Sequence, residues 1–196
     1  MDENKKRPLQ SLTFRPLTPS RWPDLEKLFG PRGACAGCWC MYWKLPRREF
    51  EAGQGEPNRL AQRAIVAAGG TPGLLACVDG VPAGWIAVEP RQNYSLLARS
   101  RILKPVDETP VWSVTCFFIA RPYRRQGLMV DLLKAAIAHV KSHGGKVVEG
   151  YPVEPRPGQA TSPVFIYTGV ASAFRQAGFV EVARRSETRP IMRFYI

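Results

Sequence analysis

Apolar residues along the 196-residue chain follow two different periods, which predict an alternation of helices and strands. Apolar positions spaced three or four residues apart predict helices over residues 19–29, 58–68, 128–143 and 167–177. Short runs rich in β-branched and aromatic residues predict strands at residues 12–17, 74–78, 83–89, 111–120, 146–149, 179–183 and 191–195. This order predicts a mixed α/β fold that contains both hairpins and crossovers.

The segment 111–120 is the strongest predicted strand. It is apolar on both faces, which favours a central place in the sheet. Three segments lack a clear period and are expected to be irregular: residues 32–46, the basic segment 91–110, and residues 152–163 with four prolines.

Composition narrows the possible classes. Hydrophobic residues make up 45% of the chain, which excludes a wholly disordered protein. No apolar run approaches the roughly 20 residues that cross a bilayer. The charged start, residues 1–10, leads into no apolar signal core, so we expect a flexible tail there and a cytoplasmic protein.

The charge of the chain is less ordinary, because 28 Lys and Arg against 16 Asp and Glu give +12. Such an excess attracts nucleic acid, an anionic membrane or a phosphate-rich small molecule. The basic residues are scattered without a run of five, and no nucleic-acid motif is visible, so nucleic acid is the weakest of these candidates.

The turn after the central strand carries the clearest chemical signal. The strand ends at Ala120, and the chain passes through Arg124, Arg125 and Gly127 directly into a helix. Helix N-termini present unpaired N–H groups and partial positive charge, which favour a phosphate. The simpler alternative is a crossover that needs glycine for packing and arginine for solubility.

Residues 124–129, Arg-Arg-Gln-Gly-Leu-Met, resemble the (Arg/Gln)-x-x-Gly-x-(Gly/Ala) acetyl-CoA signature of the GNAT family of N-acetyltransferases. The approach at residues 119–123 and the late Phe-x-x-x-Gly-Phe at residues 174–179 are also similar to that family. So is the order of the elements over residues 12–196. Two positions depart from the family pattern: Met129 replaces the last Gly or Ala, and Phe174 stands where many members carry a tyrosine that acts as general acid.

The resemblance implies a fold and a co-substrate. It implies a mostly antiparallel sheet flanked by helices, a single domain over residues 11–196, acetyl-CoA as donor, an amine acceptor, no metal, and a possible homodimer. The loop amides would bind the CoA pyrophosphate and the preceding strand would pair with the pantetheine arm. The implied cofactor contacts are Phe117, Phe118, Ile119, Arg124, Arg125, Gln126, Gly127, Leu128 and Met129.

Acetyl transfer to an amine needs deprotonation of the amine, stabilisation of an oxyanion and protonation of the leaving thiolate. Glu149 and Glu154 are candidate bases, although either is equally a solvated charge. Tyr167 is a candidate acid, since seven residues place it on the same face of the expected helix as Phe174. An unpaired strand amide at residues 117–119 would hold the oxyanion, and positioning alone is the alternative to a dedicated base.

The segment around Cys35, Cys38 and Cys40 has several interpretations. Three thiols are one short of a closed zinc site, and no second cysteine pair exists. A redox pair lacks a helix-start setting. We favour a packed loop whose small residues let the neighbouring aromatic residues sink into the sheet. In a GNAT-like fold the segment would border the acceptor pocket, so we also expect an aromatic wall of Trp39, Tyr42 and Trp43.

The leading hypothesis is therefore an acetyl-CoA-dependent N-acetyltransferase that acts on a primary amine of a small molecule or peptide. The alternative is a GNAT-like module that binds acyl-CoA without turnover. The positive charge disfavours a strongly cationic acceptor.

Overall fold

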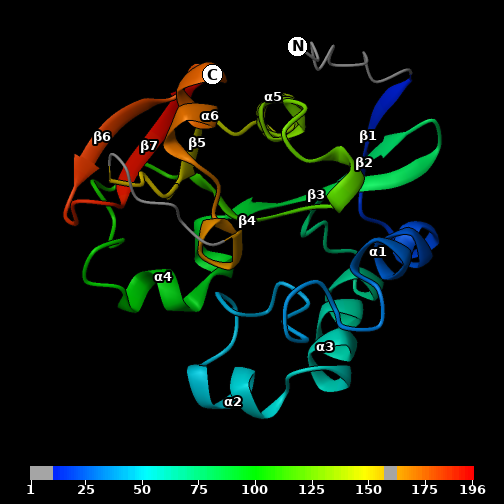
Figure 1. Cartoon of the computed structure of the whole chain (residues 1–196). Coiled ribbons are helices and arrows are strands. Elements are labelled where there is room, and N and C mark those ends of the chain that lie inside the picture. The colour runs from blue at the N-terminus through cyan, green and yellow to red at the C-terminus, as the bar shows by residue number, and fades with distance from the viewer. Residues whose placement is uncertain (1–10, 157–162) are drawn as a thin grey trace.

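A computed structural model describes residues 11–156 and 163–196, so the expected N-terminal tail lies outside the described residues. Seven strands form one sheet in the order β1-β2-β3-β4-β5-β7-β6 (Figure 1). The strands are β1 Leu12–Pro16, β2 Gly73–Val78, β3 Val81–Pro90, β4 Trp112–Ile119, β5 Val147–Gly150, β6 Val180–Arg184 and β7 Pro190–Tyr195. The α-helices are α1 Trp22–Phe29, α2 Arg47–Ala52, α3 Glu56–Ala67, α4 Ser95–Arg99, α5 Leu128–Ser142 and α6 Ala171–Gln176, and the 3-10 helices are η1 Pro19–Arg21, η2 Arg91–Asn93, η3 Arg121–Tyr123 and η4 Pro163–Ile166.

The sheet is mixed and mostly antiparallel, as expected. Strands β1 to β4 follow one another as antiparallel neighbours, and β7 is antiparallel to both β5 and β6. Only β4 and β5 are parallel, and the helix α5 connects them. β4 has three strands on each side, which confirms the central position that its apolar pattern predicts.

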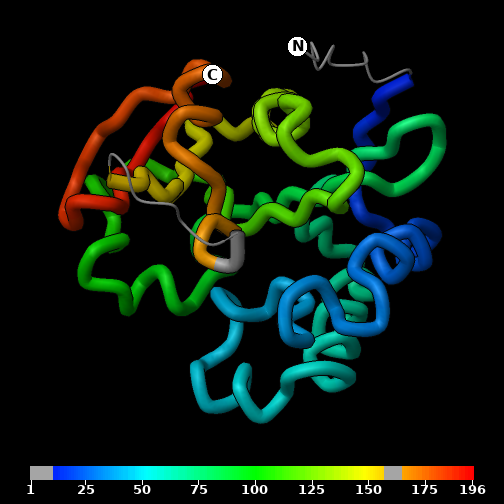
Figure 2. The backbone as a smooth tube through the Cα atoms, viewed as in Figure 1, coloured from blue at the N-terminus to red at the C-terminus, as the bar shows by residue number. Residues whose placement is uncertain are grey.

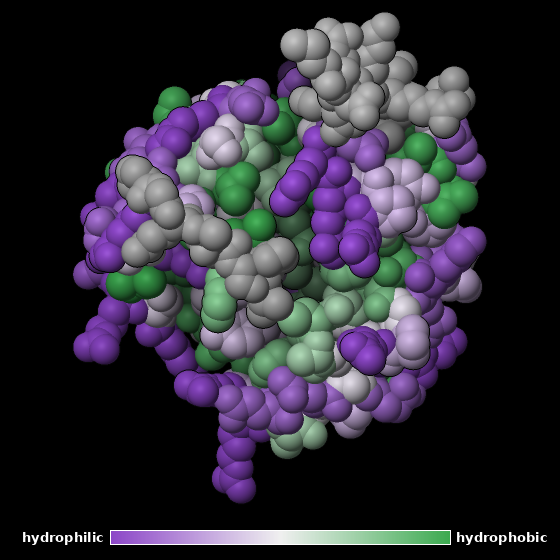
Figure 3. All heavy atoms as spheres, in the orientation of Figure 1, coloured by the Kyte–Doolittle hydropathy of each residue, from purple (hydrophilic) through white to green (hydrophobic). Residues whose placement is uncertain are grey.

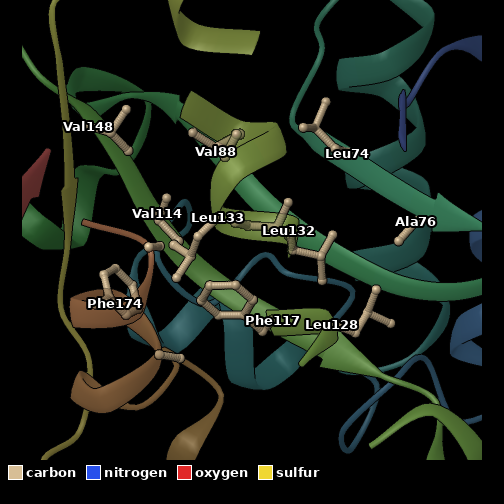
Figure 4. Packing of buried hydrophobic residues seen from close by; sticks show 14 of the residues in the cluster. Leu74, Ala76, Val88, Val114, Phe117, Leu128, Leu132, Leu133, Val148 and Phe174 are labelled. Atoms are coloured by element: carbon tan, nitrogen blue, oxygen red, sulfur yellow. The ribbon is translucent and has the colours of Figure 1, made fainter. Parts of the chain in front are cut away.

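Helices cover both faces of the sheet (Figures 1 and 2). On one face, α5 and α6 pack over the strands through an apolar cluster that includes Leu128, Leu132 and Phe174 (Figure 4). On the other face, α1, α3 and the loop that follows α1 bury a second cluster around Trp39 and Trp85. The burial of apolar side chains in these two clusters is the main source of stability for a chain of this length.

β4 and β5 separate along their length, and this separation positions the site. Their pairing covers three register steps and ends at Val114 opposite Gly150. A bulge in the β3–β4 pairing sits at the same level, and bulges bend and twist the strand that carries them. Beyond it, β4 continues to Ile119, and the Phe117 N–H donates to the Tyr167 carbonyl (2.6 Å) instead of to a strand.

The helix predicted over residues 167–177 is wrong in its first turn, because α6 begins only at Ala171. Gly169 has φ +89°, in the left-handed region that breaks a helix. The flanking backbone runs beside Val153, which donates to the Gly169 carbonyl and accepts from the Ala171 N–H, both at 2.9 Å. Tyr167 therefore precedes the helix and does not share a helical face with Phe174.

Two short helices were not predicted: α4 lies within the irregular segment 91–110, and α2 directly follows the irregular segment 32–46. Six and five residues are too few to display a repeat of 3.6, so packing rather than pattern decides their conformation. Within the described part of the chain, none of the helices combines the length and the apolar character that a bilayer crossing requires.

Candidate functional site

The turn between β4 and α5 has the backbone of an anion site. Arg125 has φ +61° and Gly127 φ +88°, so two left-handed residues flank Gln126. A Cβ built on Gly127 would meet no atom within 4 Å, so the space in front of it is open. A non-glycine residue held at positive φ is uncommon and is often found at ligand sites.

Five consecutive amides of this turn have no acceptor in the described part of the chain. The Tyr123 and Arg124 N–H groups donate back to Ala120 and Arg121, and the Val130 N–H donates to Gly127 (2.8 Å). Between them, the five N–H groups of residues 125–129 reach no acceptor among the residues that the structure describes, and no side chain caps the helix. Five such donors at the positive end of a 15-residue helix are an arrangement that suits an anion.

Formal charge adds to these dipoles. Arg121, Arg124 and Arg125 are exposed, and none of them has a carboxylate within 4 Å across residues 11–156 and 163–196. The Arg124 Nε donates to the Ile119 carbonyl (2.8 Å), which fixes the side chain against the end of β4. Figure 3 shows hydrophilic residues at the rim of a recess on this face, whose floor is apolar.

The side chains of residues 117–119 belong to the two cores rather than to the recess. The Phe117 ring is buried against Phe174 (centroids 6.1 Å apart), and the Phe118 ring packs on Phe29 across the other face (5.4 Å). The expectation of a free amide is wrong for Phe117, because the Tyr167 carbonyl accepts it. The Ile119 N–H remains a candidate donor to the oxyanion. N–H directions alternate along a strand, and the following amide, that of Ala120, donates to β3, so the Ile119 N–H points away from β3.

Phe174 has no exposed surface, and its ring contacts both Phe117 and Phe179. It is a core residue and has no proton to donate. The departure from the family pattern at this position is therefore accommodated by the packing of α6 against β4.

Tyr42 and Tyr167 come together at the separated half of β4. Their rings meet edge to face at 6.2 Å, and Tyr42 also contacts Trp43 (5.0 Å) and Phe50 (5.3 Å). Burial, followed by the nearby Tyr42, raises the pKa of Tyr167 well above its ordinary value. This shift keeps Tyr167 a neutral phenol at physiological pH and makes it a weaker acid than a free tyrosine.

The loop that carries Tyr42 is fixed by contacts that the sequence did not indicate. Lys44 forms a buried ion pair with Glu89 on β3, and its backbone carbonyl accepts the Ser95 hydroxyl (2.9 Å). These partners are 45 and 51 residues away in the chain, and no local pattern marks them. These two contacts of Lys44 hold the neighbouring Tyr42 near Tyr167, beside the half of β4 that has separated from β5.

Trp39 is not part of an acceptor wall, and that expectation is wrong. Its ring is buried, stacks on Trp22 (6.0 Å) and contacts Phe29 (5.5 Å). Trp43 is half-buried and packs toward the third cluster, around Tyr94. The packed-loop interpretation of the cysteine-rich segment is confirmed, because its small residues allow Trp39 to enter the core.

Glu149 lies inside a buried ion network rather than at an open site. One carboxylate oxygen accepts the Arg193 Nε (2.8 Å), and the other accepts Arg91 (3.0 Å) and the Tyr151 hydroxyl (2.7 Å). Asp107 binds the other side of Arg193. With both oxygens engaged and about 1% of its surface exposed, Glu149 has no free oxygen for an incoming proton.

Glu154 is also engaged, although it lies nearer the surface. Arg175 and Arg184 each form an ion pair with one of its oxygens. These two guanidinium groups hold the pKa of Glu154 below its ordinary value, which weakens it as a base.

The fold also places the basic segment 91–110. This segment, with Arg99, Arg101 and Lys104, follows β3 and so lies at the start of β4, whereas the glycine turn follows the end of β4. Eight strand residues separate them by about 25 Å, so these side chains are far from the turn. Over the described ranges, no cluster of three or more His, Cys, Asp or Glu side chains is arranged to hold a metal ion.

The start of α5 thus lies beyond the end of β4, past the point where β4 and β5 separate. The acetyltransferase (GNAT) family model matches residues 39–154, and the chain belongs to this family. No curated protein sequence gives a significant match.

Solved structures of acetyltransferases share the fold. The PaiA N-acetyltransferase from Thermoplasma acidophilum in complex with coenzyme A has 14% identity and a TM-score of 0.53, over 95% of this chain and 100% of that chain. A GNAT-family acetyltransferase from Streptococcus agalactiae has 15% identity and a TM-score of 0.55, over 95% and 96%. The NatC complex bound to Gag peptide and CoA has 11% identity and a TM-score of 0.53, over 95% and 99%.

Proposed function

We propose that the protein is an acetyl-CoA-dependent N-acetyltransferase that acts on a primary amine of a small molecule or peptide. The observation that carries the proposal is the set of five amides at residues 125–129, which have no acceptor among the described residues. The side chains of Arg124 and Arg125 add charge there, beyond the point where β4 and β5 separate. A diphosphate matches this combination of dipole and charge. Similar folds solved with coenzyme A support the same ligand.

In the proposed arrangement, the pantetheine arm runs from the turn along the separated half of β4 toward Tyr167. The Ile119 N–H is the candidate donor to the arm or to the oxyanion of the tetrahedral intermediate. The neutral amine attacks the thioester carbon, the C–S bond breaks, and the CoA thiolate takes a proton from the Tyr167 phenol. Tyr42 and Trp43 form the proposed acceptor wall.

Deprotonation of the amine is assigned to solvent. Glu149 pairs with Arg91 and Arg193, and Glu154 pairs with Arg175 and Arg184. Neither carboxylate is therefore available as a base. An amine is a good nucleophile once neutral, and orientation of two bound reactants supplies a large share of such rate enhancements.

Gly127→Ala tests the diphosphate site, with Gly144→Ala as a matched control at the other end of α5. Both glycines have positive φ, and a Cβ at either meets nothing within 4 Å, so the two substitutions strain the backbone equally. Titration calorimetry should show CoA affinity reduced at least tenfold in Gly127→Ala and unchanged in Gly144→Ala. Equal affinities in the two variants would place the ligand elsewhere.

Tyr167→Phe tests the acid. We expect kcat to fall about a hundredfold or more, because a general acid contributes about 10²–10⁴-fold, while the Kd for CoA stays constant. The assay is thiol release from acetyl-CoA with a panel of amines. An unchanged kcat removes Tyr167 from the mechanism, and CoA binding without any thiol release supports the non-catalytic module.

A further inference from the structure

Two cysteines from distant segments meet beneath the site. The Cys40 Sγ lies 3.5 Å from the Cys116 Sγ and donates its S–H to it, although 76 residues separate them in the chain. The Trp85 indole N–H donates to the Cys40 Sγ (3.1 Å) from the other side. The Cys40 sulfur is therefore held in place, facing its partner.

The backbone around Cys40 is unusual. Trp39 and Cys40 have φ +43° and +60°, and Ala34 and Ala36 are also in the left-handed region. Non-glycine residues in this conformation persist only when surrounding contacts impose it. Here the buried Trp39 ring and the indole of Trp85 impose it, and the result is that Cys40 faces β4.

We propose that Cys40 and Cys116 form a reversible disulfide, with a hydroperoxide as the oxidant and a small thiol as the reductant. The Cys116 sulfur attacks the terminal peroxide oxygen and becomes a sulfenic acid, and with hydrogen peroxide one water leaves. The Cys40 sulfur then attacks the Cys116 sulfur, the S–O bond breaks, and a second water leaves. Two thiol hydrogens and two electrons are lost, and the peroxide is reduced to two waters.

Exposure assigns these roles. Cys116 is partly exposed, so an oxidant can reach it, whereas Cys40 is buried and meets only its partner. The Cys40 S–H is directed at the Cys116 sulfur, so its proton leaves with the hydroxyl of the sulfenic acid as water. Cys38 is directed elsewhere, because its S–H donates to the Gly33 carbonyl (3.7 Å).

The disulfide also changes the proposed acetyltransferase site, and this second step rests on the proposed function. Cys116 directly precedes Phe117, whose amide is bound by Tyr167, and Cys40 lies two residues before Tyr42. Closing the S–S distance from 3.5 Å to about 2 Å moves one of these backbones by up to about 1.5 Å. Displacements of this size slow oriented reactions by ten- to a hundredfold.

The first experiment treats the reduced full-length chain with hydrogen peroxide and measures intact mass and disulfide-linked peptides. We expect a loss of about 2 Da, a single Cys40–Cys116 crosslink, and reversal by dithiothreitol. Cys40→Ser and Cys116→Ser should each abolish the crosslink, whereas Cys35→Ser and Cys77→Ser should retain it. A crosslink through Cys38, or stable over-oxidation of Cys116 in the wild type, would overturn the proposal.

The second experiment compares reduced and oxidised protein. We expect oxidation to lower acetyl transfer at least tenfold, to change the Kd for CoA less than threefold, and to raise the Tm by several degrees, because the link closes a long loop. Equal turnover in the two forms overturns the effect on the site. Absence of turnover in the reduced form overturns the proposed function, while the mass measurement still decides the disulfide.

Discussion

Two groups of arginines in this protein have opposite surroundings. Arg193 is buried and Arg91 is partly buried, and both pair with the buried Glu149, while Arg193 also pairs with Asp107, so each positive charge has a carboxylate partner. Arg124 and Arg125 are exposed, and no carboxylate of the described chain lies within 4 Å of them.

The contrast separates the charge that the fold uses from the charge that remains for a ligand. In the buried group, pairing offsets the cost of removing ions from water. In the turn, the arginines stand beside five amides that also have no acceptor among the described groups. Charge and dipoles left unsatisfied at one place indicate a ligand, whereas the net charge of +12 alone did not distinguish the two groups.

The largest expected effect is on stability, from Arg193→Leu. Removing this buried guanidinium leaves Glu149 with one arginine and Asp107 with none, which costs about 3–5 kcal/mol of unfolding free energy. The Tm should fall by roughly 10 °C. Urea unfolding measures the loss, and Arg47→Ala, which breaks an exposed pair with Glu51, should leave stability unchanged. A similar midpoint in all three proteins would mean that the network does not stabilise the fold.

The next effect is on binding, from the double variant Arg124→Ala/Arg125→Ala. The variant loses hydrogen bonds to charged phosphate, which costs about 2 kcal/mol of binding free energy and should raise the Kd for CoA about 30-fold. The free energy of unfolding should change by less than about 0.5 kcal/mol. Lys134→Ala/Lys141→Ala removes the same charge from the exposed face of α5 and serves as the control. If both double variants lose affinity equally, general attraction rather than the turn binds the ligand.

The smallest effect concerns acid stability, from Asp107→Asn. The Arg193 guanidinium holds the pKa of Asp107 below its ordinary value. The resulting stabilisation is present above about pH 4 and is lost as the pH falls toward the lowered pKa. Melting curves of the wild type and variant should therefore differ at pH 7 and begin to converge as the pH falls below about 4. Parallel curves down to pH 3 would show that the pair does not contribute.

The central strand, the amphipathic α5 and the glycine turn were predictable because each is encoded within a short window. Residues 111–120 are apolar on both faces, and α5 repeats its leucines at helical spacing. The prediction of the first turn of the last helix was wrong, because Gly169 and the contact with Val153 override the local helix propensity. Trp39 was misplaced for a related reason, since an aromatic residue in a loop carries no signal of which side it packs on.

The sequence by itself determined the class of fold, the position of the glycine turn before α5 and the excess of positive charge. Only the tertiary structure decided which charges are consumed in ion pairs, that Glu149 and Glu154 are engaged, that Tyr42 meets Tyr167, and that Cys40 meets Cys116. The physical reason is the distance along the chain over which each kind of interaction acts. Hydrophobic period and turn chemistry act over a few residues, whereas ion pairs, ring contacts and thiol contacts depend on segments brought together from far apart along the chain.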